Sequence, residues 1–273
     1  MTQATSSEIT AVADASVESG VVVIRDGNFA YRFRYASSKE KNRGLRIFDK
    51  EPGTVDWIRK ELRPDDVFYD VGANVGVYSI LAGCRLSAQG RVIAFEPHIP
   101  NAASLLENIF LNDLQRRAQI INLPLTSHDG FNTFHYFSEK RGSSTSQLGR
   151  TVSELEPFDP VCSEVKYGVT IDSLVEHGLI PRPDMIKIDV DGLELEVLAG
   201  MSRLLHSPGK PRSVQCEISK DNKEQILGFF ADAGYRAGQS HWTKAGMDSM
   251  ASGETVGDYP FYYVVFFAEE AQA

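Results

Sequence analysis

The side chains best suited to chemistry are carboxylates that close short apolar runs of the sequence. Asp70 ends the run VFYD directly before the turn VGANVG, and Glu96 ends RVIAFE about twenty residues beyond the last glycine of that turn. An acidic side chain at the tip of a second strand can accept hydrogen bonds from both hydroxyls of a ribose. The two carboxylates therefore indicate a site for a nucleoside-type cofactor.

The glycines of the turn bear on which nucleoside is bound. Gly72 and Gly76 have GxxxG spacing, which differs from the GxGxxG that seats a pyrophosphate on a helix N-terminus. Asp70 would repel a pyrophosphate, but it can receive the cationic amino group of a methionine moiety, directly or through water. The sequence thus favours S-adenosylmethionine over a dinucleotide, although packing of a helix on a strand alone would also select two glycines.

The run IKIDVDG places two more polar side chains on one face of a strand. Lys187 and Asp189 alternate with apolar residues, so both point the same way. Methyl transfer to a hydroxyl needs a positioned acceptor and a group that takes its proton. We expect Asp189 to be the general base or an orienting carboxylate, and Lys187 its charge partner or a hydrogen-bond donor to substrate. A purely structural buried pair is the alternative.

Further polar residues are weaker candidates. Asp189, Asp191 and Glu217 could form an oxygen-rich magnesium site, but carboxylates at strand ends more often bind substrate hydroxyls or cap helices. Asp191 and Glu217 are therefore also candidate substrate contacts. Ser144, in the polar loop SEKRGSSTSQLG, and His241, in the last loop, are two more. An ordinary exposed loop and a core or solvated histidine are the respective alternatives.

The order of the elements predicts the architecture that must position these groups. From Asp66 onward, apolar runs alternate with amphipathic segments, which is typical of an α/β fold with a doubly wound parallel sheet. The final run FYYVVFFAEE is expected to run antiparallel to its predecessor, because a loop alone joins them. We expect a flexible tail (1–20), a β-hairpin and helix extension (21–65, with the helix over 54–62) and a catalytic domain (66–273) with insertions at about 126–166 and 238–260.

Composition limits the classes of partner that the chain is expected to bind. The net charge of -9 disfavours nucleic acid and anionic membranes, and the basic stretches at 39–43 and 140–141 are short and mixed. Three scattered cysteines fit a reducing compartment. Since no run has the length of a signal or a membrane span, we expect a cytoplasmic protein. A small-molecule hydroxyl acceptor is the partner expected for the methyl transfer considered above. A homo-oligomer is left open.

Several motifs together resemble the FkbM-type group of class I S-adenosylmethionine-dependent methyltransferases. They are DVGANVGVYS (70–79), AFEP (94–97), LPLTSHDG (123–130), TIDSL (170–174) and DMIKIDVDGLELEVLAGM (184–201). The resemblance implies a Rossmann-like three-layer αβα sandwich with a mostly parallel seven-stranded sheet and an antiparallel last strand. It also implies that the methionine part is held by Asp70, Gly72, Asn74 and Gly76, the ribose by Glu96, and that Pro97, His98 and the stretch 125–127, with Leu125 and Thr126, lie near the adenine.

The same resemblance implies O-methylation of a sugar, polyketide or other secondary or surface metabolite. The family's usual IKIDVEG reads IKIDVDG here, so Asp191 stands where a glutamate is usual and its carboxylate reaches one methylene less far. Two other readings remain. An NAD-linked oxidoreductase is disfavoured by GxxxG and Asp70, and a non-catalytic S-adenosylmethionine-binding module is disfavoured by the intact acidic residues.

Overall fold

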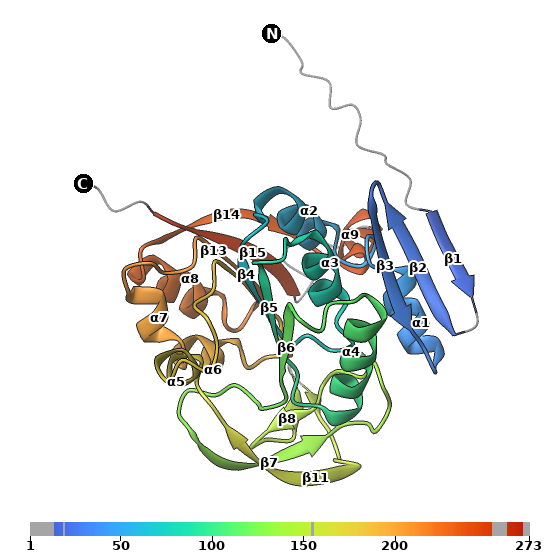
Figure 1. Ribbon diagram of the computed structural model, residues 1–273. Helices are drawn as coiled ribbons and strands as arrows, with labels where there is room; N and C mark the ends of the chain where they lie inside the picture. Colours follow the sequence, from blue (N-terminus) through green and yellow to red (C-terminus); the bar gives the residue numbers. More distant parts are fainter. Residues whose placement is uncertain (1–13, 19, 154–155, 253–260, 270–273) are drawn as a thin grey trace.

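A seven-stranded sheet lies between two layers of helices (Figure 1). The computed structural model of the chain describes residues 14–18, 20–153, 156–252 and 261–269. The strands lie in the order β14 (Tyr235–His241), β15 (Phe261–Ala268), β13 (Ser213–Ser219), β12 (Met185–Ile188), β4 (Val67–Val71), β5 (Arg91–Phe95) and β6 (Ala118–Ile121). Pairings from β13 to β6 are parallel, whereas β15 is antiparallel to both its neighbours. The predicted Rossmann-like sheet and its antiparallel last strand are confirmed.

The strands bury both faces because successive side chains point to opposite sides of a sheet. Ile186 and Ile188 face one helix layer, and Met185 faces the other. The first layer consists of α5 (Ile171–Glu176), α6 (Glu194–Ala199), α7 (Ser202–His206) and α8 (Lys223–Asp232). The second consists of α2 (Pro52–Glu61), α3 (Val77–Arg85) and α4 (Ile99–Leu111), so the helix expected over 54–62 is present.

The strand order reverses between β4 and β12. The chain leaves β4 toward β5 on one side, whereas β12 lies on the other side. In open α/β sheets, ligands bind outside the carboxyl ends of the strands at such a switch point. The ends of β4 and β12 are therefore where a site is expected.

The N-terminal extension is a small sheet with one helix. The hairpin predicted around Asp26 is formed by β2 (Val21–Asp26) and β3 (Phe29–Arg34), and α1 (Ser38–Leu45) follows. One expectation is corrected: β1 (Asp14–Glu18) pairs with β2, so the end of the expected tail is a strand. Residues 1–13 lie outside the described part. Side chains of α4 hold the edge of β3, since Asn112 Oδ1 accepts from Arg32 N–H at 2.9 Å.

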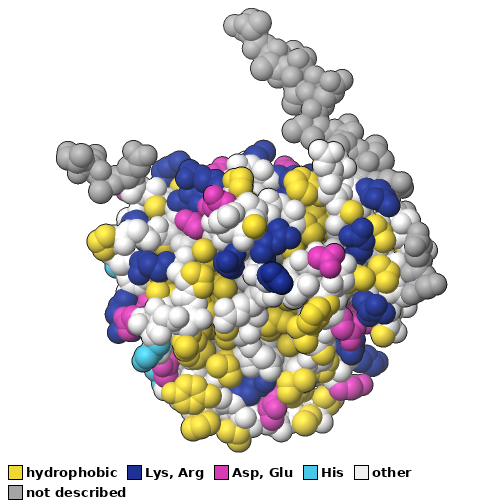
Figure 2. All heavy atoms as spheres, in the orientation of Figure 1, with side chains coloured by type: hydrophobic (Ala, Val, Ile, Leu, Met, Phe, Trp, Pro, Cys, Tyr) yellow, Lys and Arg dark blue, Asp and Glu magenta, His cyan; other side chains and the backbone are white. Residues whose placement is uncertain are grey.

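The two expected insertions differ from plain loops. The first contains β7 (Gly130–Tyr136), β8 (Gln147–Leu148) and β11 (Cys162–Gly168), which form a second sheet, and the short pair β9 (Val152–Ser153) and β10 (Glu156–Pro157). Hydrophobic side chains gather on the surface in the region of β7 and β11 (Figure 2). The second is corrected, because β14 continues to His241 and α9 (Lys244–Ala251) follows. Residues 253–260 lie outside the described part.

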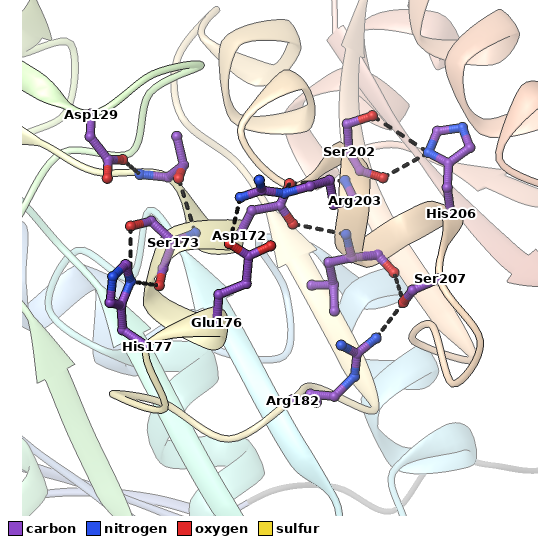
Figure 3. Close-up of polar contacts among 12 residues, drawn as sticks. Asp129, Asp172, Ser173, Glu176, His177, Arg182, Ser202, Arg203, His206 and Ser207 are labelled. Carbon is purple, nitrogen blue, oxygen red and sulfur yellow. Dashed lines mark hydrogen bonds and ion pairs between the residues drawn. The ribbon is translucent and has the colours of Figure 1, made fainter.

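Short helices on the α5–α7 side are tied together by polar contacts (Figure 3). Asp172 of α5 accepts hydrogen bonds from the N–H groups of Arg203 at 2.9 Å and Leu204 at 2.8 Å. These are N-terminal N–H groups of α7, which lack partners within the helix. Arg203 also pairs with Glu176 of α5 at 2.8 Å. Within the described ranges, no helix is long and apolar enough to cross a bilayer.

Candidate active site

The turn after β4 is pressed against the chain that follows β12. Gly72 has a φ of +82°, and a Cβ built on it would lie 1.8 Å from the carbonyl oxygen of Asp189. Glycine is therefore required by both conformation and space. Gly76 has a φ of +88°, but its added Cβ would strike Leu105 Cδ1 of α4 at 2.3 Å. The first glycine thus shapes the site, whereas the second allows α3 and α4 to pack.

A cavity of about 90 Å³ opens beside this turn. Of the residues predicted to hold a cofactor, those that line it are Gly72, Asn74, Glu96, Pro97, His98 and Leu125. Ser144 and Asp191, predicted to contact substrate, also line it. Asp70, Gly76 and Thr126 are not among the lining residues. The cavity thus unites most of the residues expected around the nucleoside part of a cofactor.

Glu96 presents a carboxyl group to the cavity while being only 5% exposed. Its Oε2 accepts a hydrogen bond from Asn74 N–H at 2.6 Å, and its Oε1 accepts one from His98 N–H at 2.9 Å. Burial raises the pKa of Glu96 to about 7, although both N–H donors oppose this shift. The ionised form retains lone pairs for further donors such as sugar hydroxyls.

His98 binds backbone groups through both ring nitrogens. Its Nδ1 accepts from Asn101 N–H at 3.4 Å, which caps α4, and its Nε2 donates to the carbonyl oxygen of Ser138 at 2.7 Å. These partners assign the ring proton to Nε2. Burial lowers the pKa of His98, so the ring is neutral near pH 7. A ligand in the cavity would meet the ring of this histidine, whose nitrogens are already engaged.

Residues 142–148, here called the strap, form one wall of the cavity. The carbonyl oxygen of Ser143 accepts from the amide nitrogens of Asn74 at 2.8 Å and Asn101 at 2.7 Å. Thr145 N–H donates to Asp191 Oδ2 at 2.9 Å. Thr145 has a φ of +82°, which is a strained conformation for a β-branched residue. The strap therefore joins the α4 side of the cavity to the loop after β12.

A second polar group lies on the α2–α3 side of the same strand ends. Lys187 is 1% exposed, its Nζ donates to Asp189 Oδ2 at 2.7 Å, and it lies 4.9 Å from the ring centroid of Tyr78. Burial alone would lower the pKa of Lys187, but the carboxylates of Asp189 and Glu51 raise it. The lysine therefore stays charged and binds Asp189. Of the two side chains, that of Asp189 is the more accessible, at 19% exposed.

Asp70 lies beside this ion pair in the neighbouring strand, in register with Lys187. Ser79 Oγ donates to its Oδ2 at 2.6 Å, whereas Oδ1 has no hydrogen-bond partner in the part of the chain described. Burial raises the pKa of Asp70, and the charge of Lys187 opposes that shift. A buried acceptor without a partner is unusual and marks a place for a donor, including an ammonium group or a water.

Comparison with known proteins identifies one family. The family model described as a methyltransferase FkbM domain matches residues 70–237, more than half of the chain. The chain is also 31% identical over 189 residues to the hexuronic acid methyltransferase AglP of Haloferax volcanii, covering 66% of this chain and 67% of that relative. The chain belongs to the FkbM methyltransferase family.

Other similar proteins carry related names. Methyltransferase sdnD of Sordaria araneosa is 28% identical over 153 residues, which is 48% of this chain and 59% of the relative. The crystal structure of methyltransferase FkbM from Methylobacillus flagellatus KT aligns with a TM-score of 0.49 at 17% identity, covering 85% of this chain and 56% of that one. The FkbM methyltransferase described here thus spans less than two thirds of sdnD.

The remaining predicted residues of this FkbM methyltransferase lie outside the cavity. His241 Nε2 lies 3.3 Å from Thr54 Oγ1, and its ring stacks on Tyr263 with 5.4 Å between centroids. Burial lowers the pKa of His241 to about 4. Burial and the negative charge of Asp189 raise the pKa of Glu217 well above its ordinary value. Among the residues described, no three His, Cys, Asp or Glu side chains form a metal-binding group, those expected for magnesium included.

Some residues that shape the site were not among those predicted from the sequence. Asn101 bonds the strap, and Glu51 is fully buried beside Lys50, with Nζ and Oε1 2.7 Å apart. Glu194 Oε1 accepts from the N–H groups of Val190 and Gly192, both at 3.2 Å, and so fixes the loop that carries Asp191. Only Glu194 left a signal, because an acidic residue in the first turn of a helix is typical of N-terminal capping. Asn101 bonds the strap across a long sequence separation, and the charge of Glu51 acts on Lys187, which is also far away in the sequence.

Proposed function

We propose that the protein is an S-adenosylmethionine-dependent O-methyltransferase of a small polyhydroxylated or glycosylated metabolite. The observation that carries the proposal is the arrangement of Glu96 and Asp189 around the Gly72 turn, with one carboxyl in the cavity and the other at the end of the adjacent strand. Glu96 would hold the ribose of a nucleoside cofactor, and the turn at Gly72, which touches the carbonyl oxygen of Asp189, would lie between the two carboxylates. That is the arrangement methyl transfer needs.

The residues present fit S-adenosylmethionine better than a dinucleotide. Glu96 would hold the ribose, and the backbone at Gly72 and Asn74 would lie along the methionine part. The unpartnered Oδ1 of Asp70 suits a cationic amino group, directly or through a water. Asp70 and Asp191 near the turn would repel a pyrophosphate, which disfavours the NAD-linked reading.

When bound, S-adenosylmethionine would supply an electrophilic methyl group on sulfur. Asp189 would accept a hydrogen bond from the acceptor hydroxyl and take up its proton, while the methyl–sulfur bond of the cofactor would break as the methyl–oxygen bond forms and S-adenosylhomocysteine would leave. Lys187, with Nζ 2.7 Å from Asp189 Oδ2, fixes the direction of this carboxylate. The other carboxylate oxygen is left for the acceptor. Support for a sugar-type acceptor comes from the relative named as a hexuronic acid methyltransferase.

Cofactor choice and turnover can be tested separately. Isothermal titration calorimetry should find binding of S-adenosylhomocysteine and none of NAD; binding of NAD alone would favour the oxidoreductase. Labelled S-adenosylmethionine is then incubated with sugars, glycosides and polyketide alcohols, and the products are read by mass. Cofactor binding without transfer to any acceptor would favour a non-catalytic module.

The role of Asp189 is tested on the acceptor so identified. Asp189→Asn should lower kcat on the order of 10²–10⁴-fold, because an amide cannot take a proton. Its affinity for S-adenosylhomocysteine should change little. Asp184→Asn is a matched control, because Asp184 accepts Val67 N–H at the opposite end of the sheet. Full activity in Asp189→Asn would exclude this residue as the base.

A further inference from the structure

A groove rich in cations opens between α1 and α9. Its lining includes the basic side chains Lys39, Arg43, Arg46 and Lys50, together with Thr243 and Ala245. Its volume is about 370 Å³, within the range of roughly 300–1,000 Å³ that is usual for small-molecule sites. Lys39 and Arg43 belong to the stretch 39–43, which looked short and mixed in the sequence, and Arg46 and Lys50 follow it.

The groove is positive in a chain whose net charge is -9. Of its four basic side chains, Lys50 alone pairs with a carboxylate among the described residues, that of Glu51. Lys39, Arg43 and Arg46 are left without such a partner. Burial, followed by the nearby charge of Arg43, lowers the pKa of Lys39, and the carboxylate of Asp191, which also interacts with Arg43, opposes the shift. A bound anion would relieve this repulsion.

The opposite wall adds a positive helix end. Thr243 is the N-cap of α9, and its side chain accepts from Gly246 N–H at 3.1 Å. Ala245 lies in the first turn, where the N–H of Lys244 already donates to the carbonyl oxygen of Lys50 at 2.8 Å and that of Gly246 to Thr243. The N-terminal end of a helix carries a partial positive charge that favours anions. The α1 side of the groove and the N-terminal end of α9 therefore both contribute positive charge to it.

The groove adjoins the candidate active site on two sides. Arg43 Nε donates to the carbonyl oxygen of Gly142 at 2.8 Å, so the basic wall continues into the strap. On the other side, Lys50 contacts Glu51, whose charge also acts on Lys187. The charge of Asp189 also acts on Lys50, so the groove lies within electrostatic range of the proposed base.

We propose that this groove binds a phosphoryl group of the methyl acceptor, which makes the acceptor a phosphate- or diphosphate-bearing metabolite. The three cations without carboxylate partners carry three positive charges, and a ligand carboxylate would neutralise only one of them. A phosphate monoester, with a charge of about -1.5 to -2, would neutralise more. A single arginine side chain can also donate two parallel hydrogen bonds to two oxygens of one phosphate. That the bound molecule is the methyl acceptor rests on the function proposed above, whereas anion binding by the groove is independent of that function.

Anion binding is tested on the full chain with pyrophosphate as the probe, by calorimetry at low salt. Arg46→Gln and Lys39→Gln should each weaken pyrophosphate binding about tenfold, and the double variant should abolish it. Lys41→Gln, which removes one charge from the same helix outside the groove, should bind as the wild type does. S-adenosylhomocysteine affinity should be the same in all variants. No binding by the wild type, or equal losses in Lys41→Gln, would overturn the proposal.

A second arm distinguishes the sources of negative charge. Glucose, glucuronate, glucose 1-phosphate and UDP-glucose are compared as competitors of pyrophosphate. Competition by the two phosphorylated compounds and not by glucuronate supports the proposal; equal competition by glucuronate overturns it. If pyrophosphate binds in the groove but no compound that occupies it is ever methylated, the anion site stands and the proposed transfer fails.

Discussion

Glu96 couples a proton equilibrium near neutral pH to the candidate cofactor cavity. Its pKa of about 7 follows from burial, and ionisation is what allows the carboxylate to accept hydrogen bonds from both hydroxyls of a ribose. We expect the affinity of the wild type for S-adenosylhomocysteine to fall about tenfold from pH 8 to pH 6, because the protonated fraction must first ionise. Calorimetry at the two pH values measures this difference.

The matched variant is Glu96→Gln, which has the same shape and no titration. It should bind weakly at both pH values, since losing a hydrogen bond to a charged group costs about 1.5–3 kcal/mol. A wild-type affinity that does not change between pH 6 and 8 would contradict the role given to Glu96.

Single residues with local signals could be predicted from the sequence. Asp70, Glu96 and the Lys187–Asp189 pair were found because strand alternation and the distance from the glycine turn fix their places. The burial of Asp70 away from the cavity could not be predicted, because it depends on Ser79 of the following helix.

At the scale of elements, the strap is a wall of the cavity that is held by side chains from distant parts of the sequence. The free volume of about 90 Å³ is below the roughly 300 Å³ usual for small-molecule sites, so a nucleoside must displace a wall to enter. Asn101 holds the strap twice, since Nδ2 donates to Ser143 O at 2.7 Å and Oδ1 accepts from Gly142 N–H at 2.8 Å.

We expect Asn101→Ala to speed dissociation of S-adenosylhomocysteine about tenfold, because two buried hydrogen bonds of the closed strap are lost. Stopped-flow displacement measures the rate. Asn112→Ala is the control, because Asn112 makes similar bonds to Arg32 at the far end of α4. Equal dissociation rates in the two variants would show that the strap does not gate the cavity.

Elements were predictable where composition and alternation agree. The parallel strands are continuous apolar runs, so they and the antiparallel last strand followed from the sequence. The helix α9 was missed, because KAGMDSMA has two methionines as its only large apolar residues. The strap was recognised only as a polar loop, because its conformation depends on Asn101 and Asp191, which lie far away in the sequence.

The molecule as a whole brings the N-terminal extension and α9 to the edge of the catalytic domain. The cationic groove exists only through this assembly, since α1 precedes the matched family range and α9 follows it. The net charge of -9 was used to disfavour nucleic acid and anionic membranes as partners, and it gave no information on how four cations gather on one side. Local fields depend on the fold more than on the total charge.

Two buried groups whose pKa values shift in opposite directions should make opposite contributions to the pH dependence of the free energy of unfolding. Burial raises the pKa of Glu194 from 4.5 to about 7, so the folded state holds this proton longer and stability falls as pH rises between these values. Burial lowers the pKa of His241 from 6.5 to about 4, so stability rises with pH in that window. Relative to wild type, the free energy of unfolding of Glu194→Gln should therefore rise with pH by about 1–3 kcal/mol, and that of His241→Phe should fall similarly. Urea unfolding at pH 4.5, 5.5 and 7 measures both slopes, and two slopes of the same sign would refute the assignment.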